Sequence, residues 1–287
     1  MSSWFNANEA LLQVVMINAT LAAALQLSLN AGMLSLAPVA FWGIGGFVGA
    51  NLATEAGWGL WPILVVVAIV TAVAAAIVSL PLTRLRGLAF AMATLAFLLI
   101  VQSLSISLKE WTGGALGLYG IPVLTSTGSL AVVAVVVALV LSQLERGQSG
   151  RRIDVLRTDE SVSETMGIDV VRTRITIFSI AAAIGGVSGA MNALAFNSFG
   201  SDSFGFSMAL GIIAMVVIGG MRSWVGAYLG ALLLTMAPSW LQALGDWSNV
   251  VYGVMVVVVI GYFSDGLLGL IRRAVGLVRT RPTREPA

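Results

Sequence analysis

The chain is a succession of long apolar runs separated by short polar breaks. Because a helix needs about 20 mainly apolar residues to cross the hydrocarbon core of a bilayer, such runs predict membrane spans. Nine segments follow one another: 10–36, 39–54, 60–80, 87–108, 128–144, 175–196, 206–221, 224–244 and 249–271. The second and seventh, at 16 residues each, are short for a complete crossing. The pattern predicts an all-α fold, a polytopic transmembrane helical bundle with about nine hydrophobic segments, one or two of them short or re-entrant.

Composition supports this reading and narrows the chemistry. Of the 287 residues, 58% are hydrophobic and 10% are charged, whereas soluble domains carry about 25% charged residues. We therefore interpret residues 1–287 as a single transmembrane domain. The chain has no His and no Cys, which excludes imidazole or thiolate metal sites, Ser-His-Asp triads and disulfides. A paired intramembrane Asp set and a G-x-S-x-G motif are also missing, so we expect neither catalytic residues nor a metal site.

Basic residues predict the orientation of the bundle. If the N-terminus lies outside, the cytoplasmic stretches are those around 37–38, 81–86, 145–174, 222–223 and 272–287. These stretches hold 14 of the 15 basic residues, and only Lys109 falls elsewhere. Since cytoplasmic loops are enriched in Lys and Arg, the pattern predicts an N-out, C-in topology.

Residues 145–174 form the one long charged loop between the spans, with six Arg and six acidic residues. Thr158 is a candidate N-cap, the acids that follow it suit a helix N-terminus, and Gly167 suits a C-cap. The pattern predicts a helix of about two turns with Val162 and Met166 on one face. Because such a short helix is marginal alone in water, we expect a partner protein to bury that face. The alternative is a solvated loop with a chance cap.

The same loop resembles a segment of branched-chain amino acid ABC transporter permeases of the Liv type. Residues 157–160 (RTDE) and 164–168 (ETMGI) are similar to the family pattern R-x-x-E-x-A-A-E-A-M-G-I, with Val162, Ser163 and Thr165 at its alanine positions. In that family the loop docks on an ATPase subunit. The resemblance therefore implies ATPase docking through Arg157, Asp159, Glu160, Val162, Glu164, Met166 and Gly167.

Four further blocks carry the resemblance across most of the chain. They are 32–45 (GMLSLA…FWGIG), 86–97 (RGLAFAMATLAF), 112–122 (TGGALGLYGIP) and 217–227 (VIGGMRSWVGA), the last with Arg222 in place of a common Gly. The second and third of these blocks are typical of the LivM-like subunit and generally missing from its LivH-like partner.

The resemblance implies a function and a set of partners. The chain would be a membrane-spanning permease subunit of an ATP-driven importer for branched-chain or similar hydrophobic amino acids, in the bacterial plasma (inner) membrane. It would pair with a homologous LivH-like permease, two ATPase subunits and an extracytoplasmic solute-binding protein. ATP and Mg would bind the ATPases, so we expect no cofactor and no catalysis in this chain, and no nucleic acid partner.

The glycine-rich segment 39–54 is a candidate part of the substrate path. Its glycines weaken helicity, and a broken or re-entrant helix would expose backbone groups suited to a carboxylate. Together with polar residues inside other spans, this predicts a path past Phe41, Gly43, Gly45, Thr94, Gln102 and Asn192. For each of these residues the alternative is helix packing or an interhelical hydrogen bond.

The predicted exterior loop 109–127 carries two large aromatic residues. We expect Lys109, Glu110, Trp111 and Tyr119 to contact a solute-binding protein; the alternative for the aromatic residues is an interfacial belt.

Other readings of function stay open. Permeases of this family also serve urea, amides and aromatic acids, and a stand-alone secondary transporter is a further alternative. Such a transporter usually needs buried carboxylates, and the one candidate, Asp265, lies near the end of the last segment. Asp265 is either an intramembrane ion-binding carboxylate or an interfacial acid paired with Arg272 or Arg273.

Overall fold

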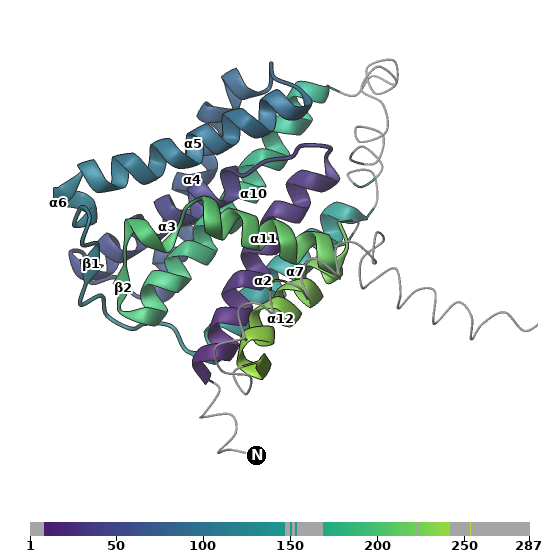
Figure 1. Cartoon of the computed structure of the whole chain (residues 1–287). Helices are drawn as coiled ribbons and strands as arrows, with labels where there is room; N and C mark the ends of the chain where they lie inside the picture. The colour runs from purple at the N-terminus through teal and green to yellow at the C-terminus, as the bar shows by residue number, and fades with distance from the viewer. Residues whose placement is uncertain are drawn as a thin grey trace, which may run out of the picture.

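The computed structural model describes residues 9–146, 169–221 and 223–241, together with the single residues Gly150, Ile153 and Gly253. Most of these residues are helical (Figure 1). The elements are α2 (Glu9–Asn30), α3 (Ala37–Thr54), α4 (Leu60–Leu82), α5 (Gly87–Ser107), α6 (Lys109–Thr112), β1 (Leu118–Tyr119), α7 (Thr127–Glu145), α10 (Val170–Phe196), β2 (Ser198–Phe199), η1 (Ser201–Ser203), α11 (Phe206–Gly219) and α12 (Trp224–Leu241).

Eight of the nine hydrophobic segments correspond to helices of the structure. The ninth, at 249–271, and its Asp265 lie outside the described residues, apart from Gly253. Six helical stretches are long and apolar enough to cross a membrane in the part of the chain that the structure describes. The structure therefore confirms a polytopic helical membrane protein.

The helix α10 holds the bundle together. It packs against α3, α4 and α2, while α2 also packs against α12 and α7, and α5 lies against α3. Figure 1 shows α5 along one side of the bundle and α7 with α12 on the other. At 27 residues, α10 is about 40 Å long at 1.5 Å per residue, so it reaches from one end of the bundle to the other.

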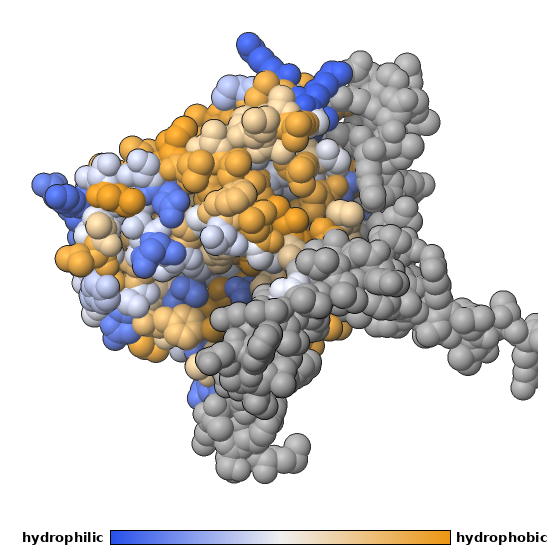
Figure 2. Space-filling model, viewed as in Figure 1, coloured by the Kyte–Doolittle hydropathy of each residue, from blue (hydrophilic) through white to orange (hydrophobic). Residues whose placement is uncertain are grey.

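The outward faces of the peripheral helices are apolar. Exposed side chains include Ile69 and Ile77 of α4, Leu88 and Met92 of α5, and Leu139 of α7. Figure 2 shows a hydrophobic belt across the middle of the molecule, with hydrophilic residues gathered toward its ends. Exposure of such a belt to water is unfavourable, whereas contact with lipid chains is not, so these faces suit a membrane interior.

The prediction of a broken helix in segment 39–54 is wrong, because α3 is one continuous helix from Ala37 to Thr54. Its glycines serve close packing instead. A Cβ atom on Gly45 would collide with the backbone of Gly186 in α10, and one on Gly189 would collide with the carbonyl of Trp42. Helix contacts at this separation offset the low helix propensity of glycine.

The stretch 197–205, non-helical apart from the single 3-10 turn η1, separates α10 from a short helix. Asn197 ends α10 in the left-handed conformation, and β2 then pairs antiparallel with β1, with Leu118 opposite Phe199. The following helix α11 has 14 residues, which at 1.5 Å each is about 21 Å. By itself α11 is short for a crossing, whereas the stretch Ser201–Gly219, which includes η1, has 19 residues and is one of the six that are long and apolar enough to cross a membrane.

The connections gather at two ends of the bundle. The Lys109 end holds the start of α2, α6, β1, β2 and the start of α7, since Thr127 donates to Glu9 at 2.7 Å and Asn51 donates to the Trp111 carbonyl at 2.7 Å. The Arg86 end holds the end of α2, the connection between α4 and α5 and the end of α7, where Asn30 donates to Glu145 at 3.4 Å.

Candidate translocation path and its two ends

Two phenylalanines of the non-helical stretch cover the glycine-rich face of α3. Phe199 and Phe204 are each 1% exposed. The Phe199 ring lies 5.0 Å from the ring of Trp42 and 5.0 Å from that of Phe47, measured between ring centroids. A Cβ on Gly46 would overlap the Phe199 ring, and a Cβ on Gly43 would overlap the Phe204 ring. The rings therefore fill space that the missing side chains leave on α3.

Gln102 of α5 holds the same stretch from the other side. Its amide nitrogen donates to the carbonyl oxygens of Ser201 at 3.1 Å and of Phe204 at 2.8 Å. In this structure the Gln102 side chain thus links α5 to the backbone of the stretch 197–205 by hydrogen bonds. Irregular backbone at membrane depth needs such partners, because lipid offers none.

Phe41 and Thr94 lie closer to the Arg86 end. Phe41 is fully buried, with its ring 5.4 Å from Phe97 and 6.1 Å from Phe178. The Thr94 hydroxyl accepts a hydrogen bond from the Leu36 backbone nitrogen at 3.1 Å and donates to the Ala91 carbonyl at 2.9 Å. The backbone nitrogen of Leu36, just before α3, thus has a protein partner.

Gly45 and Asn192 belong to the contact between α3 and α10. Gly45 faces Gly186, and Asn192 lies half-buried on α10, about one turn beyond Gly189. The structure brings Gly43 and Gln102 together around the phenylalanine-bearing stretch 197–205, whereas Phe41, Thr94, Gly45 and Asn192 lie within the bundle. Their role in substrate passage stays a prediction.

The four exterior-loop candidates are exposed at the Lys109 end. Trp111 is 68% and Tyr119 is 72% exposed, and Lys109 and Glu110 are exposed as well. The glycines of this loop fix its path: Gly113 (φ 70°) and Gly117 (φ 81°) adopt left-handed conformations that glycine favours. A Cβ on Gly117 would lie 2.7 Å from the Gly200 Cα, so the loop packs directly on the stretch that carries Phe199.

A carboxylate at the Arg86 end was missed by the sequence reasoning. Glu145, the last residue of α7, is half-buried, and one of its oxygens (Oε1) accepts three hydrogen bonds. The donors are Gln26 Nε2 at 3.3 Å, Asn30 Nδ2 at 3.4 Å and the Trp224 backbone nitrogen at 3.2 Å. Glu145 therefore joins α7 to α2 and to the N-terminus of α12. Its position beside five other acids in a charged loop concealed this role.

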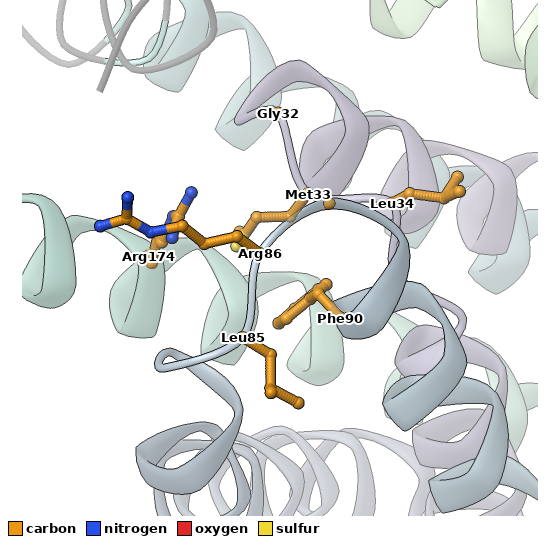
Figure 3. Close-up of a pocket in the computed structure, with 8 residues that line it drawn as sticks. Gly32, Met33, Leu34, Leu85, Arg86, Phe90 and Arg174 are labelled. Carbon is orange, nitrogen blue, oxygen red and sulfur yellow. The ribbon is translucent and has the colours of Figure 1, made fainter. Parts of the chain in front are cut away.

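A small pocket opens at the Arg86 end between three elements. It is lined by Gly32, Met33, Leu34, Leu85, Arg86, Gly87, Phe90 and Arg174. Figure 3 shows Arg86 and Arg174 side by side next to Met33, with Leu85 and Phe90 below them. The pocket leaves about 10 Å³ for the centre of a water-sized sphere, room for about one water. It is too small for an amino acid in this conformation.

The predicted docking residues Arg157, Asp159, Glu160, Val162, Glu164, Met166 and Gly167 lie outside the described residues. The structure does describe where the loop 145–174 enters α10. Asp169 caps that helix by accepting from the Arg172 backbone nitrogen at 3.0 Å, and its other oxygen lies 3.0 Å from Arg172 Nε. Asp169, within the predicted loop 145–174, is thus the N-cap of α10.

Within the described residues, no group of three or more Asp or Glu side chains could hold a metal ion. The fold and these sites define a multi-pass helical membrane protein. Residues 8–260 match the family model described as "Branched-chain amino acid transport system / permease component". The chain belongs to this family of permeases, which are transport components rather than enzymes, and it resides in the bacterial plasma (inner) membrane.

Individual relatives agree with the family. The chain is 29% identical over 275 residues to the "High-affinity branched-chain amino acid transport system permease protein LivM" of Salmonella typhimurium, and likewise to LivM of Escherichia coli K12. Each match takes in 84% of this chain and 65% of LivM, so the chain spans about two thirds of those relatives. A "Probable ABC transporter permease protein YphD" of E. coli is 29% identical over 160 residues, 53% of this chain and 46% of YphD. No solved structure matches significantly.

Proposed function

We propose that the chain is the LivM-like permease subunit of an ATP-driven importer for branched-chain or similar hydrophobic amino acids. The observation that carries this is the family match over residues 8–260. The chemistry of the interior is compatible with it. Apart from Ser188, the buried side chains along α3 and α10 are apolar or aromatic, so a passing leucine side chain would meet surfaces of its own polarity.

The partners follow from the same proposal. A LivH-like permease completes the membrane part, two ATPases with ATP and Mg supply the energy, and a solute-binding protein delivers the substrate. The exposed residues Lys109, Glu110, Trp111 and Tyr119 contact the binding protein, and the loop 145–174 contacts an ATPase.

The proposed topology is N-out, C-in, with nine hydrophobic segments. What supports it is the distribution of charge over the two ends of the bundle. In the described part of the chain, Arg84, Arg86, Arg146, Arg172 and Arg174 belong to the connections of the Arg86 end, and Lys109 belongs to the other. Because positive loops stay in the cytoplasm, the Arg86 end faces inward.

Reconstitution tests the proposal. The chain, its partner permease, the ATPases and the binding protein are placed in proteoliposomes, and uptake of labelled leucine is followed with and without ATP. We expect ATP-dependent uptake that unlabelled isoleucine and valine inhibit. Inhibition by urea, short amides or aromatic acids alone would reassign the substrate, and uptake without ATP and partners would favour a secondary transporter.

A further inference from the structure

One continuous helix connects the predicted ATPase-docking loop to the phenylalanines that cover α3. The loop 145–174 enters α10 at its Asp169 cap, and α10 ends at Asn197, two residues before Phe199. A helix of this length transmits a displacement from one end to the other as a rigid element. Its contact with α3 runs over Gly185, Gly186 and Gly189. Because these residues have no side chains, few protruding groups oppose a sliding movement of α10 along α3.

The stretch 198–204 is held at the Lys109 end by few contacts. Gln102 supplies two hydrogen bonds, and the pairing with β1 involves two residues on each strand. Each hydrogen bond contributes about 1 kcal/mol net, so the hydrogen bonds alone oppose a displacement of the stretch only modestly. The burial of its two phenylalanine rings is the main interaction that retains it.

The surface beneath the two phenylalanine rings includes a buried hydrogen-bond donor without an acceptor among the described residues. Trp42 is 2% exposed, and among the described residues its indole nitrogen Nε1 has no hydrogen-bond partner. A buried donor without an acceptor is unfavourable by about 1–3 kcal/mol, and such groups are rare in native structures. A donor of this kind beside Gly43 and Gly46 suits a ligand that brings an acceptor, such as a carboxylate, together with an apolar side chain.

We propose that Phe199 and Phe204 are the outer gate of the translocation path, and that Trp42, Gly43 and Gly46 form the substrate-contacting surface that this gate covers. The structure is then an outward-closed state. Movement of α10 withdraws the two rings, the substrate side chain takes their place against the glycines, and Trp42 Nε1 donates to its carboxylate. The proposal rests on the transport function proposed above.

Thiol labelling tests the gate without knowledge of the substrate. The chain contains no Cys, so a thiol introduced by Trp42→Cys is its only one. In the reconstituted importer, an impermeant maleimide is added from the Lys109 side, and labelling of this chain is measured by mass. We expect ATP turnover, or removal of the rings by Phe199→Ala with Phe204→Ala, to raise the labelling rate at least tenfold. The control Ala23→Cys, fully buried in α2, stays protected under both conditions. Equal labelling of position 42 under all conditions would overturn the gate.

A reversible lock tests whether the gate must open for transport. Gly46→Cys combined with Phe199→Cys places one thiol where the tip of the ring now meets α3 and the other about one ring length away, so the pair suits a mercuric bridge, which is longer than a disulfide and which added thiol removes. Bridging is expected to lower uptake at least tenfold and added thiol to restore it, while the single variant Phe199→Cys, which keeps Gly46, does not respond to the treatment. Undiminished uptake by the bridged protein would contradict the proposal. The wild-type vesicles report leucine uptake in parallel, so a wrong substrate and a wrong gate give different results.

Discussion

Glu145 offers the clearest test of how the Arg86 end is held together. A carboxylate in the last turn of α7 opposes the helix dipole, which is unfavourable by about 0.3–1 kcal/mol. It is retained because it serves another helix: the Trp224 backbone nitrogen at the start of α12 donates to it, together with Gln26 and Asn30 of α2. Replacing Glu145 should therefore weaken the junction of three helices rather than only the end of its own.

The magnitude follows from the three hydrogen bonds. Their lengths of 3.2, 3.3 and 3.4 Å are long, so we assign each bond about 1 kcal/mol, the value typical of a bond between neutral groups and below the range for bonds to a charged group. Glu145→Ala removes all three and should lower the free energy of unfolding by about 3 kcal/mol. Glu145→Gln keeps an acceptor oxygen and loses only the charge, so we expect the free energy of unfolding to fall by about 1 kcal/mol. Gln26 keeps a second acceptor in the Met221 carbonyl, which moderates the loss.

Unfolding of the purified protein in mixed micelles, followed by circular dichroism as the denaturing detergent fraction rises, measures these differences. Gln143→Ala is the matched control, because Gln143 is exposed on the same last turn of α7 and should change stability by less than about 0.5 kcal/mol. If Glu145→Ala cost no more than Gln143→Ala, the junction would have no energetic significance and the reasoning would fail.

Further predictions concern α3 and its neighbours. Gly45→Ala sets a methyl group against the backbone of Gly186, so we expect the purified protein to lose its sharp thermal transition, while Gly211→Ala, with open space around it, keeps the wild-type melting temperature. Thr94→Val removes the acceptor for the Leu36 backbone nitrogen without changing volume; a loss of about 1–3 kcal/mol in the same detergent titration is expected, and an unchanged midpoint would show that water replaces the hydroxyl.

The spans could be predicted from the sequence because membrane insertion depends on local composition. Apolar length and charge at the breaks are properties of each segment alone, and for this reason α4, α5 and α7 begin and end within a few residues of their predicted bounds. The continuity of α3 could not be predicted in this way. Its glycines lower helix propensity, and only the close approach of α10 compensates for them.

Contacts between distant segments account for what the sequence did not predict. The pairing of Leu118 with Phe199 joins residues about 80 positions apart, and two-residue strands leave no alternating pattern to detect. Glu145 was grouped with the acids of a charged loop, since nothing local distinguishes a carboxylate that accepts from another helix. Both features depend on three-dimensional proximity and have no periodic signal.

The central claim is that this chain is the membrane part of an ATP-driven importer, coupled to its ATPases through the loop 145–174. The most direct measurement compares ATP hydrolysis and labelled-leucine uptake in the reconstituted complex for wild type, Glu164→Arg, and Asp154→Arg, which reverses a charge in the same loop outside the docking pattern. We predict that Glu164→Arg loses both activities together and assembles weakly, while Asp154→Arg retains them. Uptake that proceeds without ATP or partners, and that is insensitive to Glu164, would contradict the account.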